Sequence, residues 1–462
     1  MPLLIKNGEI VTASERYTAD IYCEGETITR IGRDLTPASA DARVVDASGK
    51  YVFPGFIDPH THVYLPFMGT FAKDTYETAS RAALIGGTTT IFDMCCPARD
   101  TDAADGLRQW QQESAGRSAC DYSFHMGVTR FDEANAAQLR RIVAEEGVAS
   151  FKIFLAYKGA FGIDDAELYG ALKLARELGV VVAAHCENEA LVAARQAELL
   201  AVGLTGPASH HESRPPLVEA EGVHHLMTFA QLTGAHVYIV HLSCEEALQE
   251  ATAARLRGVN VRVETLIQYL LLDKTYAERP DFEGAKYVMS PPLRDRHNQA
   301  VLWHALRSGL VDTVATDHAP FDFATQKTLG KDDFTKIPNG IPSLEERVNL
   351  LFTHGVGEGR LDLHTFVQVA STNAAKTFGL FPRKGTIQVG SDADLVVYDP
   401  DFRGTISART QAMNLDYSAF EGWETKGRPA AVTLRGEVVV EDGRFVGTPG
   451  RGQFLKRLPI HF

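Results

Sequence analysis

Cysteine is scarce in this sequence of 462 residues, and the few cysteines form no cluster. There is no CxxC pair and none of the dense spacing that marks a zinc ribbon or a disulfide framework. The six are Cys23, Cys95, Cys96, Cys120, Cys186 and Cys244. We therefore expect free, mostly packed thiols in the reducing environment of the cytoplasm.

Long apolar runs and blocks of basic residues are also missing. The first residues, Met-Pro-Leu-Leu-Ile-Lys-Asn-Gly, lack the basic segment and apolar stretch of a secretory signal. No run approaches the roughly 18 apolar residues that a membrane span needs. The 59 acidic residues outnumber the 46 Lys and Arg, and the net charge of −13 repels a phosphate backbone. We expect neither a membrane nor a nucleic acid as partner.

The composition is that of a globular protein with a large core. Hydrophobic residues make up 45% of the chain and charged residues 23%, which excludes collagen, a coiled coil and a disordered chain. The length allows three average domains, but one α/β barrel of about 250 residues plus a smaller β domain fits equally well.

Both ends of the chain read as short strands separated by turns. At the start the β pattern covers 3–11, 21–31 and 43–53, and it returns at 385–398 and 431–443. Neither end has enough strands for a stable sheet of its own. We predict one composite β-sandwich domain built from residues 1–53 and 385–462.

Between the two ends, short apolar runs alternate with stretches of helical spacing. We predict eight buried strands, at 55–63, 88–94, 123–129, 150–155, 180–186, 236–242, 259–264 and 312–317. The clearest helical stretches are 75–85, 134–146, 165–178, 244–257 and 294–308. Alternation of this kind favours an α/β fold in which residues 54–384 form a (β/α)8 barrel.

Ionisable residues interrupt five of these apolar runs. They are His60, His62, Lys152, His185, His241 and Asp317. A lone buried histidine is usually a hydrogen-bonded core residue. The carboxyl ends of all barrel strands meet at one face, however, so these six side chains should converge there. Together and without a counter-ion they would carry a large desolvation cost, and a divalent metal relieves it. We predict a metal site.

Lys152 is the unusual member of the set. A barrel lysine is ordinarily paired with a carboxylate, but the nearest charges expected here are metal ions, which disfavour an ammonium group. A neutral amine can react with carbon dioxide to form a carbamate, an anion with two oxygens that suits two metals. We predict that Lys152 is carboxylated on Nζ (N6-carboxylysine).

The chain resembles the amidohydrolase superfamily, and within it the cyclic-amidohydrolase branch of dihydropyrimidinases and bacterial D-hydantoinases. The residues that carry the resemblance run in family order through nearly the whole chain: Pro54-Gly-Phe-Ile-Asp-Pro-His-Thr-His, Ser150-Phe-Lys-Ile-Phe-Leu-Ala-Tyr-Lys, Ala184-His-Cys-Glu-Asn, Val240-His-Leu-Ser, Met289-Ser-Pro-Pro-Leu-Arg, Ala315-Thr-Asp-His-Ala-Pro-Phe and Pro338-Asn-Gly-Ile-Pro.

The resemblance implies two Zn²⁺ per chain, bridged by carboxylated Lys152 and a hydroxide. It also implies that Tyr157 stabilises the oxyanion, that Asp317 shuttles the proton, and that Ser290 and Asn339 grip the ring amide with main-chain groups. Read without the resemblance, Tyr157 is a packed aromatic, and Ser290 and Asn339 are ordinary turn residues. The implied assembly is a homotetramer.

Specificity should depend on the apolar residues near the metal motif. The family places residues such as Leu65, Phe154 and Phe161 around the exocyclic group of the ring. A dihydroorotase-like enzyme would need a cation just after His62, where this chain has an apolar stretch. Ala319 replaces the cysteine typical of the family and leaves the preferred ring substituent open.

The implied reaction is hydrolysis of 5,6-dihydropyrimidines or 5-monosubstituted hydantoins to N-carbamoyl amino acids. An allantoinase shares the metal set, but its polar substrate fits the apolar stretch less well. Non-enzymatic dihydropyrimidinase-like interaction proteins share the fold but lack the metal ligands, which are all retained here.

Overall fold

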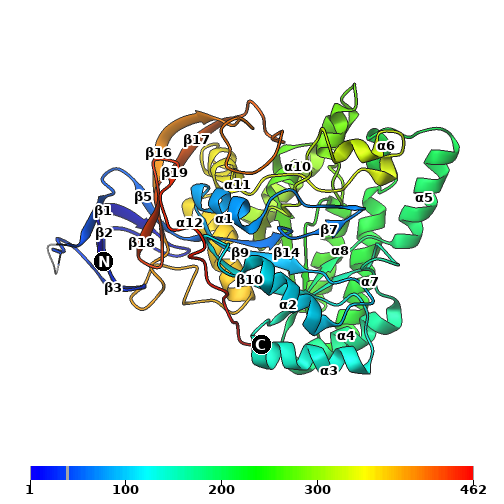
Figure 1. The fold of residues 1–462 in the computed structure, drawn as a ribbon, viewed down its shortest axis with the longest axis horizontal. Coiled ribbons are helices and arrows are strands. Elements are labelled where there is room, and N and C mark those ends of the chain that lie inside the picture. Colours follow the sequence, from blue (N-terminus) through cyan, green and yellow to red (C-terminus); the bar gives the residue numbers. More distant parts are fainter. Residues whose placement is uncertain (1, 38–40, 461–462) are drawn as a thin grey trace.

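The computed structural model describes residues 2–37 and 41–460, which form two large sheets with helices around one of them (Figure 1). The first sheet lies at the left of the view and contains strands from both ends of the chain, and the second is surrounded by helices at the right. No helix among the described residues combines the length and the apolar character needed to cross a lipid bilayer.

The eight predicted barrel strands are all present and pair in parallel, in sequence order. They are β6 (Phe56–Thr61), β9 (Thr88–Cys95), β10 (Asp121–Gly127), β11 (Ser150–Phe154), β12 (Val181–His185), β13 (His236–Ile239), β14 (Val261–Leu266) and β15 (Thr313–Ala315). The ring closes where the His62 backbone N–H donates to the carbonyl of His318 over 2.8 Å. The predicted (β/α)8 barrel is confirmed.

Helices follow the strands of the barrel. They are α1 (Tyr76–Ile85), α2 (Ala103–Ser114), α3 (Glu133–Arg141), α4 (Asp165–Leu178), α5 (Glu189–Ala201), α6 (Ala208–Glu212), α7 (Pro216–Thr233), α8 (Glu245–Leu256), α9 (Ile267–Leu271), α10 (His297–Arg307), α11 (Arg347–Leu351), α12 (Leu363–Val367) and α13 (Asn373–Thr377). Helices α5 and α6 line an outer cavity next to the predicted site, and others cover the outside of the barrel. The limits of α4 follow from local chemistry: Asp164 and Glu167 form a capping box, and Gly179 ends the helix at φ 68°. The predicted helix at 134–146 is α only as far as Arg141 and continues as one π turn.

The chain-end sheet contains strands from both termini. From the start of the chain come β1 (Leu3–Val11), β2 (Arg16–Glu24), β3 (Thr27–Gly32), β4 (Arg43–Asp46) and β5 (Tyr51–Pro54), and from the end come β16 (Leu395–Thr405), β17 (Glu424–Leu434), β18 (Glu437–Glu441) and β19 (Arg444–Phe445). The two groups join where β5 pairs with β16 in antiparallel register, with Val52 opposite Val397. The composite β part is confirmed, and its division from the barrel at residues 53 and 385 stays a prediction.

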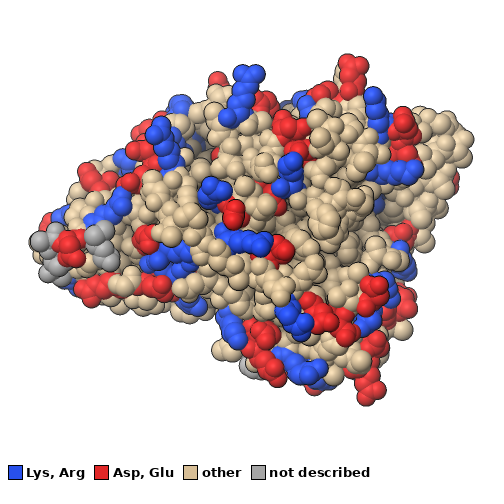
Figure 2. Space-filling model, viewed as in Figure 1, with Lys and Arg blue, Asp and Glu red and all other residues tan. Residues whose placement is uncertain are grey.

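Charged side chains of both signs are interspersed on the face drawn in Figure 2. A buried ion-pair cluster, in contrast, connects the barrel to the chain-end sheet. The Lys384 ammonium lies 2.8 Å from Asp121 Oδ2 at the start of β10, 2.5 Å from Asp394 Oδ2 and 3.1 Å from Asp392 Oδ2. Arg435 also pairs with Asp121. Because this cluster lies at the amino ends of the barrel strands, it stabilises the fold at the end opposite the predicted site.

Removing the central cation of this cluster should destabilise the whole protein. We expect Lys384→Met to lower the free energy of unfolding by about 3 kcal/mol, because buried carboxylates lose their partner. Urea unfolding followed by circular dichroism measures the change. Lys173→Met on the exposed face of α4 is the control, with an expected change within about 0.5 kcal/mol. Equal stability of the two variants would contradict the structural role of the cluster.

Candidate active site

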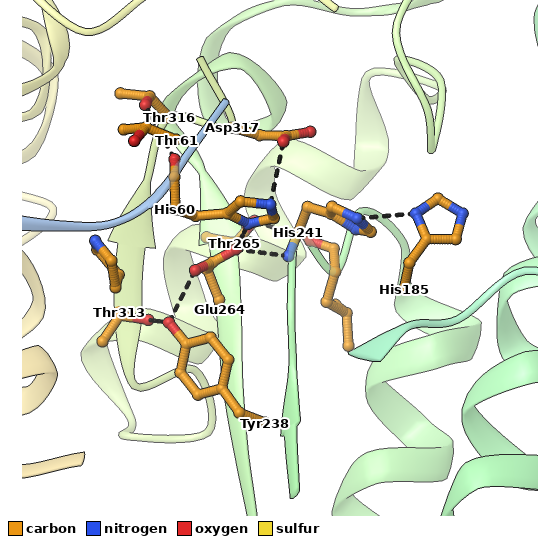
Figure 3. Close-up of polar contacts among 12 residues, drawn as sticks. His60, Thr61, His185, Tyr238, His241, Glu264, Thr265, Thr313, Thr316 and Asp317 are labelled. Atoms are coloured by element: carbon orange, nitrogen blue, oxygen red, sulfur yellow. Dashed lines mark hydrogen bonds and ion pairs between the residues drawn. The ribbon is translucent and has the colours of Figure 1, made fainter. Parts of the chain in front are cut away.

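The six predicted metal ligands lie at the carboxyl ends of five barrel strands. His60 is in β6 and His62 follows it, Lys152 is in β11, His185 ends β12, and His241 and Asp317 come two residues after β13 and β15. Figure 3 shows side chains from separate strands pointing toward one another. Parallel pairing in a closed barrel produces this convergence, because all the strands end on the same face.

His60, His62 and Asp317 form the first half of the site. Asp317 Oδ1 lies 3.1 Å from His60 Nε2 and 3.0 Å from His62 Nε2, and the two histidine nitrogens are 3.3 Å apart. Ligand atoms of all three residues are close enough to hold one metal ion. Burial alone would raise the pKa of Asp317, but His60 and His62 hold it well below its usual range.

Lys152, His185 and His241 form the second half. His185 Nδ1 lies 3.0 Å from His241 Nε2. Lys152 is fully buried, and its Nζ has no hydrogen-bond partner among the described residues. Burial lowers the pKa of this amine. Because the Lys152 amine is buried without a hydrogen-bond partner among the described residues, its neutral form is favoured.

The donor set fits divalent metal ions. His60 Nδ1 donates to Glu264 Oε1 (2.7 Å) and His185 Nε2 donates to Glu187 Oε2 (2.8 Å), so the other nitrogen of each ring faces the centre and can bind a metal ion when it carries no proton. Four imidazoles and a carboxylate are the ligand types that zinc and similar ions prefer.

Glu264 and Glu187 contact predicted metal ligands and were not predicted from the sequence. Glu264 Oε1 also accepts the backbone N–H of His241 (2.8 Å), and Oε2 accepts the hydroxyl of Tyr238 (2.8 Å). Glu187 pairs with Arg214 as well as with His185. For Glu264 a signal existed: it is a charged residue inside a buried strand, the same criterion that selected Lys152. Glu187 follows its strand and carried no such signal.

An inner pocket brings the predicted substrate residues to the metal ligands. His60 is fully buried and does not line the pocket, but all the other predicted site residues do: His62, Leu65, Lys152, Phe154, Tyr157, Phe161, His185, His241, Ser290, Asp317 and Asn339. An outer cavity of about 1040 Å³ shares several of these walls. Phe67 contacts Tyr157 edge-on and stacks on Phe161, so the two spaces meet at an aromatic wall.

Three site residues have left-handed backbone conformations. Tyr157, His241 and Asp317 have φ values of 62°, 41° and 49°, where residues other than glycine are disfavoured. Each of them follows the end of a strand, where the chain turns and aims its side chain over the barrel mouth. Strain of this kind is tolerated where the surrounding structure enforces it, as at functional sites.

A model of the amidohydrolase family matches residues 51–439, which include the whole barrel and the pocket described above. The chain belongs to the amidohydrolase family.

Similar proteins include both hydantoinases and dihydropyrimidinases. This amidohydrolase is 47% identical to a D-hydantoinase of Geobacillus stearothermophilus over 99% of its own length and 97% of that protein. It is 38% identical to a dihydropyrimidinase of Rattus norvegicus, over 99% of its length and 89% of that protein. The structure of a D-hydantoinase (dihydropyrimidinase) from Thermus sp. superimposes with a TM-score of 0.98 at 62% identity and covers both chains fully.

Glu264 should control how tightly the amidohydrolase holds metal. We expect Glu264→Gln to weaken metal affinity by about 10–100-fold, because the charge that orients His60 is lost. Metal content after dialysis against graded chelator measures the effect. Tyr238→Phe removes only the hydroxyl group that donates to Glu264 Oε2, so it should change metal affinity less. Equal metal retention in wild type and Glu264→Gln would show that His60 needs no such support.

Proposed function

We propose that this amidohydrolase is a cyclic amidase that hydrolyses 5,6-dihydropyrimidines and 5-monosubstituted hydantoins to N-carbamoyl amino acids. The main support is the convergence of the metal-ligand set with Tyr157, Ser290 and Asn339 around one pocket. The similarity to hydantoinases and dihydropyrimidinases over nearly the full chain adds the substrate class.

The proposed cofactor is a pair of Zn²⁺ ions. His60, His62 and Asp317 would hold one ion, His185 and His241 the other, and carboxylated Lys152 would contact both. The carbamate forms when the Nζ lone pair attacks carbon dioxide and one proton leaves the nitrogen. When bound, the two ions would lower the pKa of a water molecule and polarise the scissile carbonyl group.

The protein's own residues would position the ring and move the proton. The Tyr157 hydroxyl would donate to the carbonyl oxygen as negative charge develops on it, and burial raises the pKa of Tyr157, which keeps this hydroxyl protonated. Asp317 Oδ would accept the proton of the attacking water and deliver it to the leaving ring nitrogen. Main-chain groups of Ser290 and Asn339 would bind the ring amide.

The apolar wall would select the ring substituent. Leu65, Phe154 and Phe161 line the inner pocket, and the outer cavity gives a larger substituent room to extend. Ala319 also lines the inner pocket, where its small side chain leaves space. These walls favour apolar substituents over the polar ureide group of allantoin.

We further infer a homotetramer in the cytoplasm. The assembly follows from the family resemblance, and the compartment suits six cysteines that are all free and buried. Light scattering after size exclusion measures the assembly, and a mass of one or two chains would contradict the tetramer.

A substrate panel tests the proposed reaction. We expect ring opening of dihydrouracil, dihydrothymine, hydantoin and phenylhydantoin, with about two zinc ions per chain by elemental analysis. Allantoin in the same panel should turn over most slowly, because its polar group meets the apolar wall. Absence of zinc together with no turnover of any ring would refute the proposal, and preference for allantoin would favour a ureide hydrolase.

Lys152 can be tested separately. We expect Lys152→Ala to lose metal and activity, since no anion remains between the two ion sites, and short carboxylic acids such as acetate should restore part of both. The exposed Lys158, in the loop after β11, supplies the control variant Lys158→Ala, which should keep its metal. Unchanged activity of Lys152→Ala would refute the bridging role.

A further inference from the structure

Lys327 is a fully buried lysine outside the predicted site. It begins a short 3₁₀ helix (Lys327–Gly330) in the long segment after β15. Its Nζ donates to three backbone carbonyls: Val288 (2.9 Å), Pro338 (2.6 Å) and Gly340 (2.7 Å). An ammonium group has three N–H donors, so these carbonyls match its full donor set.

The three carbonyls belong to the two segments that line the pocket with Ser290 and Asn339. The segments also contact each other directly, because Gly340 N donates to Val288 O (3.0 Å) and Asn339 Nδ2 donates to Ser290 Oγ (3.0 Å). Lys327 therefore binds both segments. Its partner Val288 is two residues from Ser290, and its partners Pro338 and Gly340 flank Asn339.

The residue before Lys327 contacts another segment that lines the outer cavity. Gln326 Nε2 donates to Thr70 Oγ1 (2.8 Å) and to the Phe71 carbonyl (2.7 Å). Thr70 and Phe71 line the outer cavity together with Asn339. The consecutive side chains of Gln326 and Lys327 thus connect three separate segments that line the two cavities: 70–71, 288–290 and 338–340.

Lys327 and Lys384 differ in the groups that their buried ammonium contacts. Lys384, the other fully buried lysine with several partners, neutralises its charge against carboxylates. Lys327 has carbonyl partners and no ion pair among the described residues. Burying an ammonium without a counter-charge is costly. An apolar side chain of the same length would avoid that cost but would leave the three carbonyls without this donor. An apolar side chain could not supply the three directional N–H groups that Lys327 donates to these carbonyls.

We propose that Lys327 is a positioning residue that holds the Ser290 and Asn339 segments at the spacing required to bind the ring amide. The inference rests on the proposed function, because the two segments matter only if their main-chain groups bind the substrate. Lys327 does not touch the substrate and acts through the carbonyls that it binds.

The test compares Lys327→Met with Lys384→Met in the full-length, metal-loaded enzyme. Methionine keeps the length of the side chain and removes the donors. We expect Lys327→Met to retain its metal, to raise KM for hydantoin with a smaller change in kcat, and to lose about 10–100-fold in kcat/KM. Lys384→Met should lose stability but keep the wild-type KM, since its cluster lies at the other end of the barrel.

Hydrogen exchange provides a second measurement that needs no turnover. Backbone amides of 288–290, 339 and 340 should exchange faster in Lys327→Met than in Lys384→Met. If Lys327→Met does not fold, Lys327→Gln keeps two N–H donors and should show intermediate KM and exchange. Wild-type KM and wild-type exchange in the Lys327 variant would overturn the positioning role alone. Failure of the wild-type enzyme to open any ring would overturn the proposed function instead.

Discussion

Closure of the barrel between its first and last strands is the constraint on which the site depends. The backbone bond from His62 to His318 brings Asp317 against His60 and His62, although more than 250 residues separate them. Without this closure the first half of the ligand set would not exist. Three of the six strands between them place Lys152, His185 and His241 by the same rule, because parallel strands in a ring end on one face.

A second layer of buried charge keeps the ligands in orientation. Glu264 links His60, the His241 backbone and Tyr238, while Glu187 links His185 to Arg214. Each carboxylate fixes which ring nitrogen carries the proton, and so which lone pair faces the centre. Lys152 Nζ is buried at the centre without a hydrogen-bond partner among the described residues, a cost that metal binding would compensate.

Much of the fold could be predicted, because the alternation of apolar runs and helical stretches and the number of strands are visible in the sequence. Eight apolar runs alternating with helical stretches predicted the barrel, and turn-rich β runs at both ends predicted the composite sheet. Charged residues in otherwise apolar runs pointed to the ligands, and Lys152 is the clearest case. Glu187 and Lys327 could not be found in this way. Glu187 follows a strand and pairs with Arg214 as well as with the nearby His185. Lys327 lies in a long irregular segment and binds three backbone carbonyls of other segments.

The sequence by itself determined the fold class, the order of the strands and the residue types gathered at their ends, because periodicity and hydrophobicity are local properties. Only the tertiary structure decided which nitrogen of each histidine faces the centre. It also decided that Tyr157, His241 and Asp317 adopt left-handed conformations, and that one buried lysine joins the two segments lining the pocket. These features depend on contacts between residues far apart in the chain, and no spacing along the sequence encodes the direction of a hydrogen bond.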